Sequence, residues 1–263
     1  MKHNTLTPKP NKLITLFYLL TAIALGYSSP AQAVDLVSKS ANNLIAQQVP
    51  KDLGSPETGR RRGGGSRNDC PKLEIPVTAL VPGDKTGKKS ILSSTIATFP
   101  SFWVFLPNLP ENINTGEFVL QDKEGEDIYR GMLKLPRKSG ITEIKLPSQP
   151  KYALKEGEKY QWYFKVFCGE PDKKTQYFHV NAWVKRIAAT PALVQQLKAN
   201  KSQEYKVYAK NNILHDALSS LATSRAASPN SSILVQNWKQ LMTTLGLPEF
   251  SEISTFQTAD VKK

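Results

Sequence analysis

Cysteine, histidine and methionine are scarce in this chain of 263 residues, which contains two, three and three of them. Cys70 and Cys168 form no Cys-x-x-Cys motif, and no two histidines have the spacing of a metal-binding pair. The Gly-x-Ser-x-Gly turn that carries the nucleophile of many hydrolases is also missing. The sequence therefore nominates no catalytic residue, no metal site and no cofactor.

A hydrophobic run long enough to cross a membrane is missing as well. The apolar run Leu13–Leu25 is too short to span comfortably the roughly 30 Å of hydrocarbon in a bilayer. It follows a basic stretch with Lys2, Lys9 and Lys12, and it precedes Ala31-Gln32-Ala33, whose small residues suit a cleavage site. We expect residues 1–33 to be a secretory signal peptide and the mature protein to be periplasmic or extracellular.

Aromatic residues are missing from residues 34–69, which are polar and end in the basic run Gly59–Arg67. We expect this segment to be a disordered basic linker. Arginine-glycine runs can bind single-stranded nucleic acid, but an exported protein rarely meets any, so we expect no nucleic-acid partner. The formal net charge of +13 favours an anionic polysaccharide or an anionic lipid surface as a partner.

Short strands dominate residues 70–187. Seven strand-like runs are bounded by Pro, Gly and Asp: Leu73–Val81, Ser101–Leu106, Glu117–Gln121, Ile128–Leu135, Thr142–Leu146, Tyr160–Cys168 and Gln176–Ile187. The spacing of Leu154, Gly157 and Tyr160 is typical of a tyrosine corner, in which the hydroxyl bonds back to the preceding loop. We expect a mainly β fold with α: an antiparallel Ig-like β-sandwich followed by a small C-terminal helical region.

The two cysteines, Cys70 and Cys168, are expected to form a disulfide bond, because export brings them into an oxidising compartment. The bridge would close a loop of 98 residues, which the chain-entropy model values at roughly 4 to 5 kcal/mol, less any strain. The alternative is a pair of buried free thiols.

The last strand-like run carries a candidate ligand-binding face. Its apolar residues alternate with four others, which share the opposite face: Tyr177, His179, Asn181 and Trp183. Aromatic rings and amide groups can stack on a sugar and hydrogen-bond to it. The simpler expectation is that the C-terminal helices cover this face and that Trp183 belongs to the core. Elsewhere, the acidic hairpin Asp122–Asp127 offers oxygen ligands for Ca²⁺, but its spacing does not match an EF-hand loop.

Helical periodicity begins after Ile187. Thr190-Pro191 opens a helix through about Ala199, and further helices are expected over Gln203–Lys210, over Ile213–Arg225 and from about Ser232 to Gly246. We assign residues 188–250 to a helical region and 251–263 to a tail. One helical hairpin cannot bury its own apolar face, so it must pack on the sandwich or on another protein. The candidate partner-docking side chains are Leu214, Leu218, Leu221, Trp238, Leu241 and Leu245.

Motifs along most of the mature chain resemble an exported cyanobacterial family known as domain of unknown function 928. The resemblance covers roughly residues 60–247 and rests on Arg61–Arg67, Cys70-Pro71, Leu80-Val81-Pro82, Phe99–Trp103, Gly116–Asp122, Tyr160–Phe164, Cys168, Trp183–Arg186 and His215–Leu218. It implies an exported protein of the cell envelope. It brings no assigned activity and no site residues.

These features favour a non-enzymatic exported module that binds a protein partner of the envelope through its helices. The alternative is a glycan-binding β-sandwich module that uses the face with Tyr177 and Trp183. An envelope hydrolase is a third hypothesis, since carboxylates distant in sequence can meet in one cleft.

Overall fold

The structure, a computed structural model, describes residues 58–65, 70–84, 86–169 and 176–261, which lie within the compact unit Ser40–Lys263. The predicted signal peptide lies outside the described residues, as do residues 34–57 and 66–69 of the predicted linker. No helix in the described part has both the length and the apolar character that a membrane span requires.

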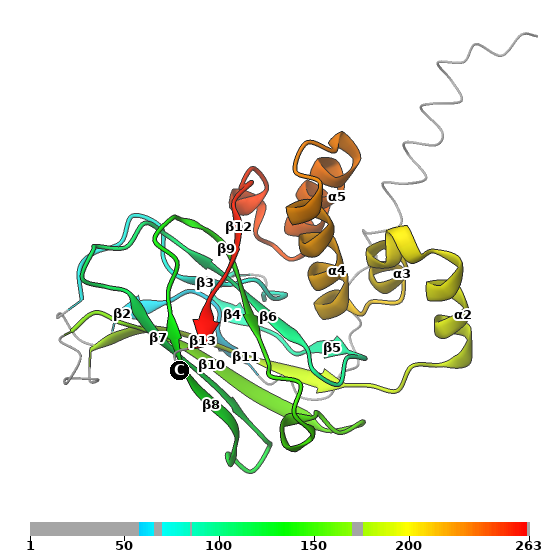
Figure 1. The fold of residues 1–263 in the computed structure, drawn as a ribbon, viewed down its shortest axis with the longest axis horizontal. Helices are drawn as coiled ribbons and strands as arrows, with labels where there is room; N and C mark the ends of the chain where they lie inside the picture. The colour runs from blue at the N-terminus through cyan, green and yellow to red at the C-terminus, as the bar shows by residue number, and fades with distance from the viewer. Residues whose placement is uncertain (1–57, 66–69, 85, 170–175, 262–263) are drawn as a thin grey trace, which may run out of the picture. The chain divides into compact units, whose positions relative to one another are not determined.

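Two larger sheets and one two-stranded ribbon form the β part of the molecule (Figure 1). The seven-stranded sheet has the order β13-β8-β7-β10-β11-β2, with β5 pairing to β11 off this path. Its strands are β2 (Gly64–Gly65), β5 (Ser93–Thr95), β7 (Thr115–Gln121), β8 (Asp127–Lys134), β10 (Lys159–Phe167), β11 (Tyr177–Arg186) and β13 (Asp260–Val261). The four-stranded sheet, in the order β12-β9-β6-β3, contains β3 (Thr78–Ala79), β6 (Ser101–Leu106), β9 (Gly140–Lys145) and β12 (Phe256–Thr258). The ribbon pairs β1 (Gly59–Arg60) with β4 (Lys89–Ser90). Only β5–β11 and β9–β12 are parallel among the pairs of described strands.

Alternate side chains of the central strands form a core between the two sheets. On β10 the buried residues include Trp162 and Phe164, and the residues between them are half-buried. Trp162 contacts Phe102 of β6, with ring centroids 5.4 Å apart, and Phe118 of β7, with centroids 6.2 Å apart. The two-residue period in Tyr160–Cys168 therefore arises because one face of β10 is buried between the sheets and the other is not.

Two contacts fix the ends of β10. The Tyr160 hydroxyl accepts a hydrogen bond from the backbone nitrogen of Lys155 at 2.8 Å, and Gly157 takes a φ of +83° in the same loop. This confirms the expected tyrosine-corner contact. Just beyond the other end of β10, Cys168 forms a disulfide bond with Cys70, and their Cα atoms are 5.4 Å apart. The predicted disulfide is thus confirmed.

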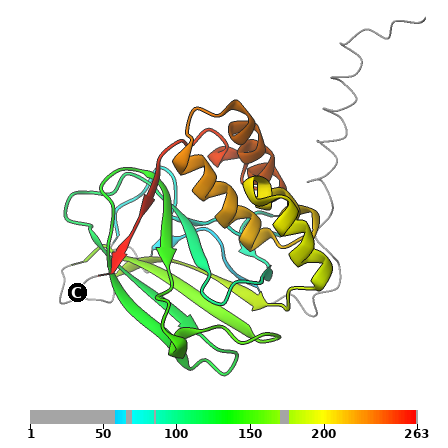
Figure 2. The same ribbon diagram turned by 45° about the vertical axis from the view of Figure 1, so that its right-hand side comes forward.

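Four C-terminal helices follow the strands (Figures 1 and 2): the last three share a core with the four-stranded sheet, and the first packs on the second. They are α2 (Pro191–Ala199), α3 (Glu204–Lys210), α4 (Leu214–Ala227) and α5 (Ser232–Thr244), with 3-10 turns at Pro150–Tyr152, Lys201–Gln203 and Pro248–Phe250. Because side chains alternate along β6, Phe102 faces the first core while Trp103 and Phe105 face the helices. The Trp103 indole donates to the Ser219 hydroxyl of α4 at 3.0 Å. β6 is therefore buried on both faces.

The mainly β fold with a C-terminal helical region is confirmed. The expected strands from Ser101 onward coincide with the observed ones within two residues at each end, and Thr190 caps α2 by accepting from the Leu193 backbone nitrogen. The run Leu73–Val81 is shorter than expected, since only Thr78–Ala79 pairs there. The Ig-like arrangement stays a prediction.

Parts of the predicted linker and of the predicted tail form strands that belong to the sheets. Residues 59–60 and 64–65, expected to be linker, form β1 and β2. Residues 256–261, expected to be tail, contain β12 and β13, which pair with β9 and β8. The linker and tail assignments are corrected for these residues, because strands of two or three residues are too short to show a period.

Candidate functional site

None of the described helices covers the side of β11 that carries Trp183. Helix α4 packs instead against β5, β6 and β12, and Figures 1 and 2 show the helices on the side of β6. Tyr177, His179, Asn181 and Trp183 are half-buried, whereas the residues that alternate with them are buried in the first core. The expectation that helices enclose Trp183 is therefore wrong.

The neighbouring strand extends this surface. We refer to eight half-buried side chains as the outer face: Gln161, Tyr163, Lys165 and Phe167 of β10, with Tyr177, His179, Asn181 and Trp183 of β11. The strand register sets Phe167 opposite Tyr177 and Gln161 opposite Trp183. Directly opposite residues of an antiparallel pair lie side by side, so aromatic and polar groups form one continuous surface.

The aromatic end of the outer face is held by contacts among its own side chains. The Tyr177 ring meets Phe167 and His179 edge-on, with centroid distances of 6.2 and 5.7 Å. The Lys165 ammonium lies 5.3 Å from the centre of the Tyr177 ring. Burial, together with the charges of Arg60 and Lys165, lowers the pKa of His179, so its imidazole is neutral at pH 7. The rings are therefore positioned before any ligand arrives.

One carboxylate borders the outer face. Glu117 of β7 is paired with Lys165 at 2.9 Å and with Arg130 at 3.0 Å. Burial acts to raise the pKa of Glu117, but hydrogen bonds from these two cations outweigh it and the pKa lies below its ordinary value. A carboxyl group that ionises this readily is a poor general acid near neutral pH.

Acidic side chains elsewhere do not gather into a metal-binding cluster within the described residues. In the hairpin that offered oxygen ligands for Ca²⁺, Asp122 accepts from the backbone nitrogens of Glu124 and Glu126, at 3.0 and 2.9 Å. Gly125 takes a φ of +88° there, so this carboxylate shapes the turn.

Residues 58–65, here named the strap, bring three consecutive arginines to the edge of β11. Because side chains alternate along an extended chain, Arg61 turns inward between Arg60 and Arg62. Arg61 is fully buried, and its guanidinium donates to the carbonyl oxygens of Leu245 and Gly246 just after α5. Carbonyls at this end of a helix lack partners within the helix and attract a cation. Burial and the charge of Arg62 lower the pKa of Arg61 to about 10, so it stays protonated at neutral pH.

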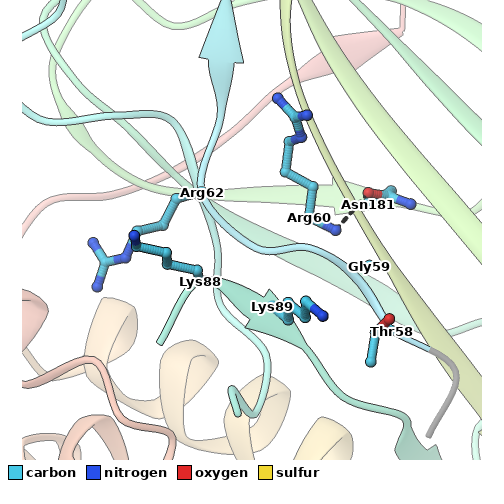
Figure 3. Close-up of a pocket in the computed structure, with 7 residues that line it drawn as sticks. All are labelled: Thr58, Gly59, Arg60, Arg62, Lys88, Lys89 and Asn181. Carbon is cyan, nitrogen blue, oxygen red and sulfur yellow. Dashed lines mark hydrogen bonds between the residues drawn. The ribbon is translucent and has the colours of Figure 1, made fainter. Parts of the chain in front are cut away.

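A cavity of about 550 Å³ opens where the strap meets β4 and β11 (Figure 3). This basic pocket is lined by Thr58, Gly59, Arg60, Arg62, Lys88, Lys89 and Asn181. Its lining holds four cationic side chains and no acidic one. Arg62 forms an ion pair with Glu249, but Arg60, Lys88 and Lys89 have no ion-pair partner within the described residues. The pocket therefore carries positive charge that these residues do not neutralise.

Asn181 belongs to both the outer face and the basic pocket. Its Oδ1 accepts a hydrogen bond from the Arg60 backbone nitrogen at 2.7 Å, as Figure 3 shows. Its backbone oxygen accepts from the Ser90 hydroxyl at 3.0 Å. Gly59 allows this close approach, because a Cβ there would overlap the Asn181 carbonyl oxygen. The aromatic surface thus continues into the cationic one.

The six candidate docking side chains lie elsewhere, inside the second core. Their exposed fractions range from 0 % for Trp238 to 6 % for Leu214. They pack with Trp103 and Phe105 of the four-stranded sheet. Of the two expected alternatives, the helices therefore pack on the sheet of their own chain. These six side chains are buried and form no exposed apolar surface for a partner.

The β11 half of the candidate site follows from the alternation along Tyr177–Trp183, whereas its cations do not follow from any period in the sequence. The available signal was a pair of basic runs, Arg60–Arg62 and Lys88-Lys89, which the fold brings together. Strands β1 and β4, which carry part of these runs, have only two residues and show no period, so the sequence alone predicts a linker for the first run.

A family model described as Domain of Unknown Function (DUF928) matches residues 62–255. No curated protein matches the chain. The matched region contains the whole outer face and the four helices, and it begins within the strap.

Proposed function

Because the chain belongs to the family described as Domain of Unknown Function (DUF928), a description that names no activity, we propose its function from its own residues. The protein is a non-enzymatic, exported module that binds a glycan of the cell envelope on its outer face. The observation that carries this proposal is the half-burial of Tyr177, His179, Asn181 and Trp183 on a sheet face that the described helices leave uncovered.

The chemistry of the outer face suits a carbohydrate chain. Trp183 and Tyr177 offer aromatic rings, and Gln161 and Asn181 offer amide groups close to them. Sugars stack on ring faces and hydrogen-bond to amides. The seven residues from Tyr177 to Trp183 cover about 20 Å of strand, which suits an extended ligand of several sugar units.

The other two hypotheses find less support. Docking of a protein through the helices would need Trp238, Leu241 and their neighbours to leave the second core, where they are buried. A hydrolase that uses Glu117 as its acid would need a raised pKa, and the pKa of Glu117 is lowered. The glycan-binding hypothesis requires neither change.

The disulfide supports the proposed export. Cys70 and Cys168 are paired, and such bonds persist mainly in oxidising compartments. The signal peptide over residues 1–33 and a periplasmic or extracellular location are parts of the same proposal. The tyrosine corner at Tyr160 likewise supports an Ig-like sandwich as the finer description of the β part.

Tryptophan fluorescence tests the proposal. Trp103, Trp162 and Trp238 are at most 4 % exposed, so Trp183 is the tryptophan best placed to respond to a ligand on the outer face. Protein purified after export of the full chain is titrated with envelope polysaccharide. We expect saturable binding with a change in emission, and Trp183→Phe should abolish that change while weakening binding.

Trp103→Phe is the matched control, because it removes a tryptophan that faces the helices. It should bind as the unaltered protein does. Absence of binding to envelope polysaccharide, or equal binding by the Trp183→Phe variant, would show that the outer face is not a glycan site.

A further inference from the structure

The basic pocket adjoins the outer face at Asn181, and its charge identifies the kind of sugar that fits. We propose that the bound glycan is acidic and that the basic pocket holds its carboxylate or sulfate groups through Arg60, Lys88 and Lys89. This inference rests on the proposed glycan-binding function and names the class of glycan.

The three cations are available to an anion. All three side chains are exposed, and none has an ion-pair partner within the described residues. Asp84 lies on the same loop as the two lysines, but its Oδ1 accepts from the Thr86 hydroxyl at 2.7 Å and from the Lys89 backbone nitrogen at 3.3 Å. That carboxylate is committed to the turn, and it does not line the pocket, whereas both lysines do.

Asn181 adds a directional donor. Because its Oδ1 accepts the Arg60 backbone N–H, the side-chain NH₂ is turned to the other side of the amide. The described residues provide no partner for this NH₂ group, and Asn181 lines the pocket. Figure 3 shows this NH₂ group on the side of Asn181 away from Arg60, where it can donate to a sugar that continues from the pocket along β11.

A membrane surface presents anions as well, but the surroundings of the pocket favour a polysaccharide. Proteins that lie on a bilayer bury apolar side chains at the interface. The large apolar side chains exposed in the described part of the chain are Ile75, Ile233 and Val261, and none of them lines the pocket. Its neighbours on β11 are His179 and Trp183, which suit a sugar.

Matched polymers test the charge of the glycan. The exported protein is titrated with polygalacturonate, with the same polymer after reduction of its carboxyl groups, with dextran sulfate and with neutral dextran. We expect binding to the two acidic polymers and at least tenfold weaker binding to each neutral counterpart. The two acidic polymers separate carboxylate from sulfate as the preferred group.

Matched variants separate the pocket from the net charge. The pocket variant carries Arg60→Gln, Lys88→Gln and Lys89→Gln. The control carries Lys198→Gln, Lys201→Gln and Lys206→Gln, which remove the same charge from exposed positions on and between α2 and α3. We expect the pocket variant to lose at least tenfold in affinity for the preferred polymer and the control to lose less than twofold. Thermal melting verifies that both remain folded.

The outcomes distinguish this inference from the proposed function. Equal binding of polygalacturonate and its reduced form would overturn the inference and leave glycan binding in place. Equal losses in the two triple variants would also overturn it, since net charge alone would then explain the affinity. Tighter binding to phosphatidylglycerol vesicles than to either acidic polymer would identify a lipid ligand instead. No binding to any of the four polymers by protein that does bind envelope polysaccharide would overturn this inference alone, whereas no binding to envelope polysaccharide would overturn both proposals.

Discussion

At the scale of single residues, Arg61 links the strap to the turn that follows α5. Its guanidinium is buried and satisfies two carbonyl oxygens that follow α5, while its backbone oxygen accepts from Ala79 at 2.8 Å. Arg61→Met would retain much of the apolar stem and leave those carbonyls without their charged donor. We expect a loss of about 2 to 3 kcal/mol in the free energy of unfolding, measured by urea denaturation.

The adjacent arginine provides the control for that measurement. Arg62 pairs with Glu249, and both side chains are about one-third exposed, at 32 % and 38 %. Ion pairs of this kind contribute about 1 kcal/mol or less, so Arg62→Met should cost no more than that. Equal losses for the two variants would show that burial of the Arg61 guanidinium is not what stabilises the strap.

His215 predicts a pH dependence of stability. It is 6 % exposed, and its ring lies edge-on to Phe102 with centroids 5.4 Å apart. Burial lowers the pKa of His215 below its ordinary value, although the charge of Asp216 opposes this. The unfolded chain therefore takes up a proton near pH 6.5 that the folded chain resists, and stability should fall as the pH drops below about 6.5.

A comparison of melting temperatures at pH 7.5 and pH 5.5 checks this. We expect a smaller decrease in His215→Gln than in the unaltered protein, with some decrease remaining because the pKa of His179 is also lowered. Burial raises the pKa of Asp216, which acts in the opposite direction. An identical decrease in both proteins would mean that His215 is not the responsible group.

At the scale of elements, β1 determines whether the basic pocket exists. Gly59 lies against the backbone of Asn181, and any side chain there would overlap its carbonyl oxygen. Gly59→Val should therefore displace β1 and separate Arg60 from β11, while the two cores keep their contacts. We expect weaker binding to acidic polysaccharide with little change in melting temperature. Unchanged binding would mean that the pocket does not depend on this close approach.

Elements with a clear period were predictable from the sequence. The alternation in Tyr160–Cys168 and the Thr190-Pro191 start of a helix each reflect a local rule, and the structure has both within one residue. Strand β1 has only two residues, and its position depends on contacts with β4 and β11 that are remote in sequence. The aromatic half of the candidate site lies on β11, whose alternation is visible in the sequence, so it could be predicted. The cationic half lies on and beside β1 and β4, which are too short to show a period, so it could not.

At the scale of the whole molecule, β6 joins two cores. Phe102 and Val104 contribute to the core between the sheets, and Trp103 and Phe105 to the core beneath the helices. The C-terminal strands β12 and β13 then pair with one sheet each. The helices therefore share a core with the β part of the molecule, and the chain after them completes both sheets.

Removal of the C-terminal region tests whether the β part can fold without the helices. A chain that ends at Ile187 loses α2 to α5 together with β12 and β13, which exposes Trp103, Phe105 and Ile141. Burial of each such side chain contributes roughly 1.5 to 3 kcal/mol, and their sum is comparable with the roughly 5 to 15 kcal/mol that stabilises a typical domain. We expect the shortened chain to aggregate or to melt without a cooperative transition, whereas the full chain should show one transition in calorimetry. A soluble shortened chain with its own sharp transition would show that the sandwich folds alone, and binding to the outer face could then be measured without the helices.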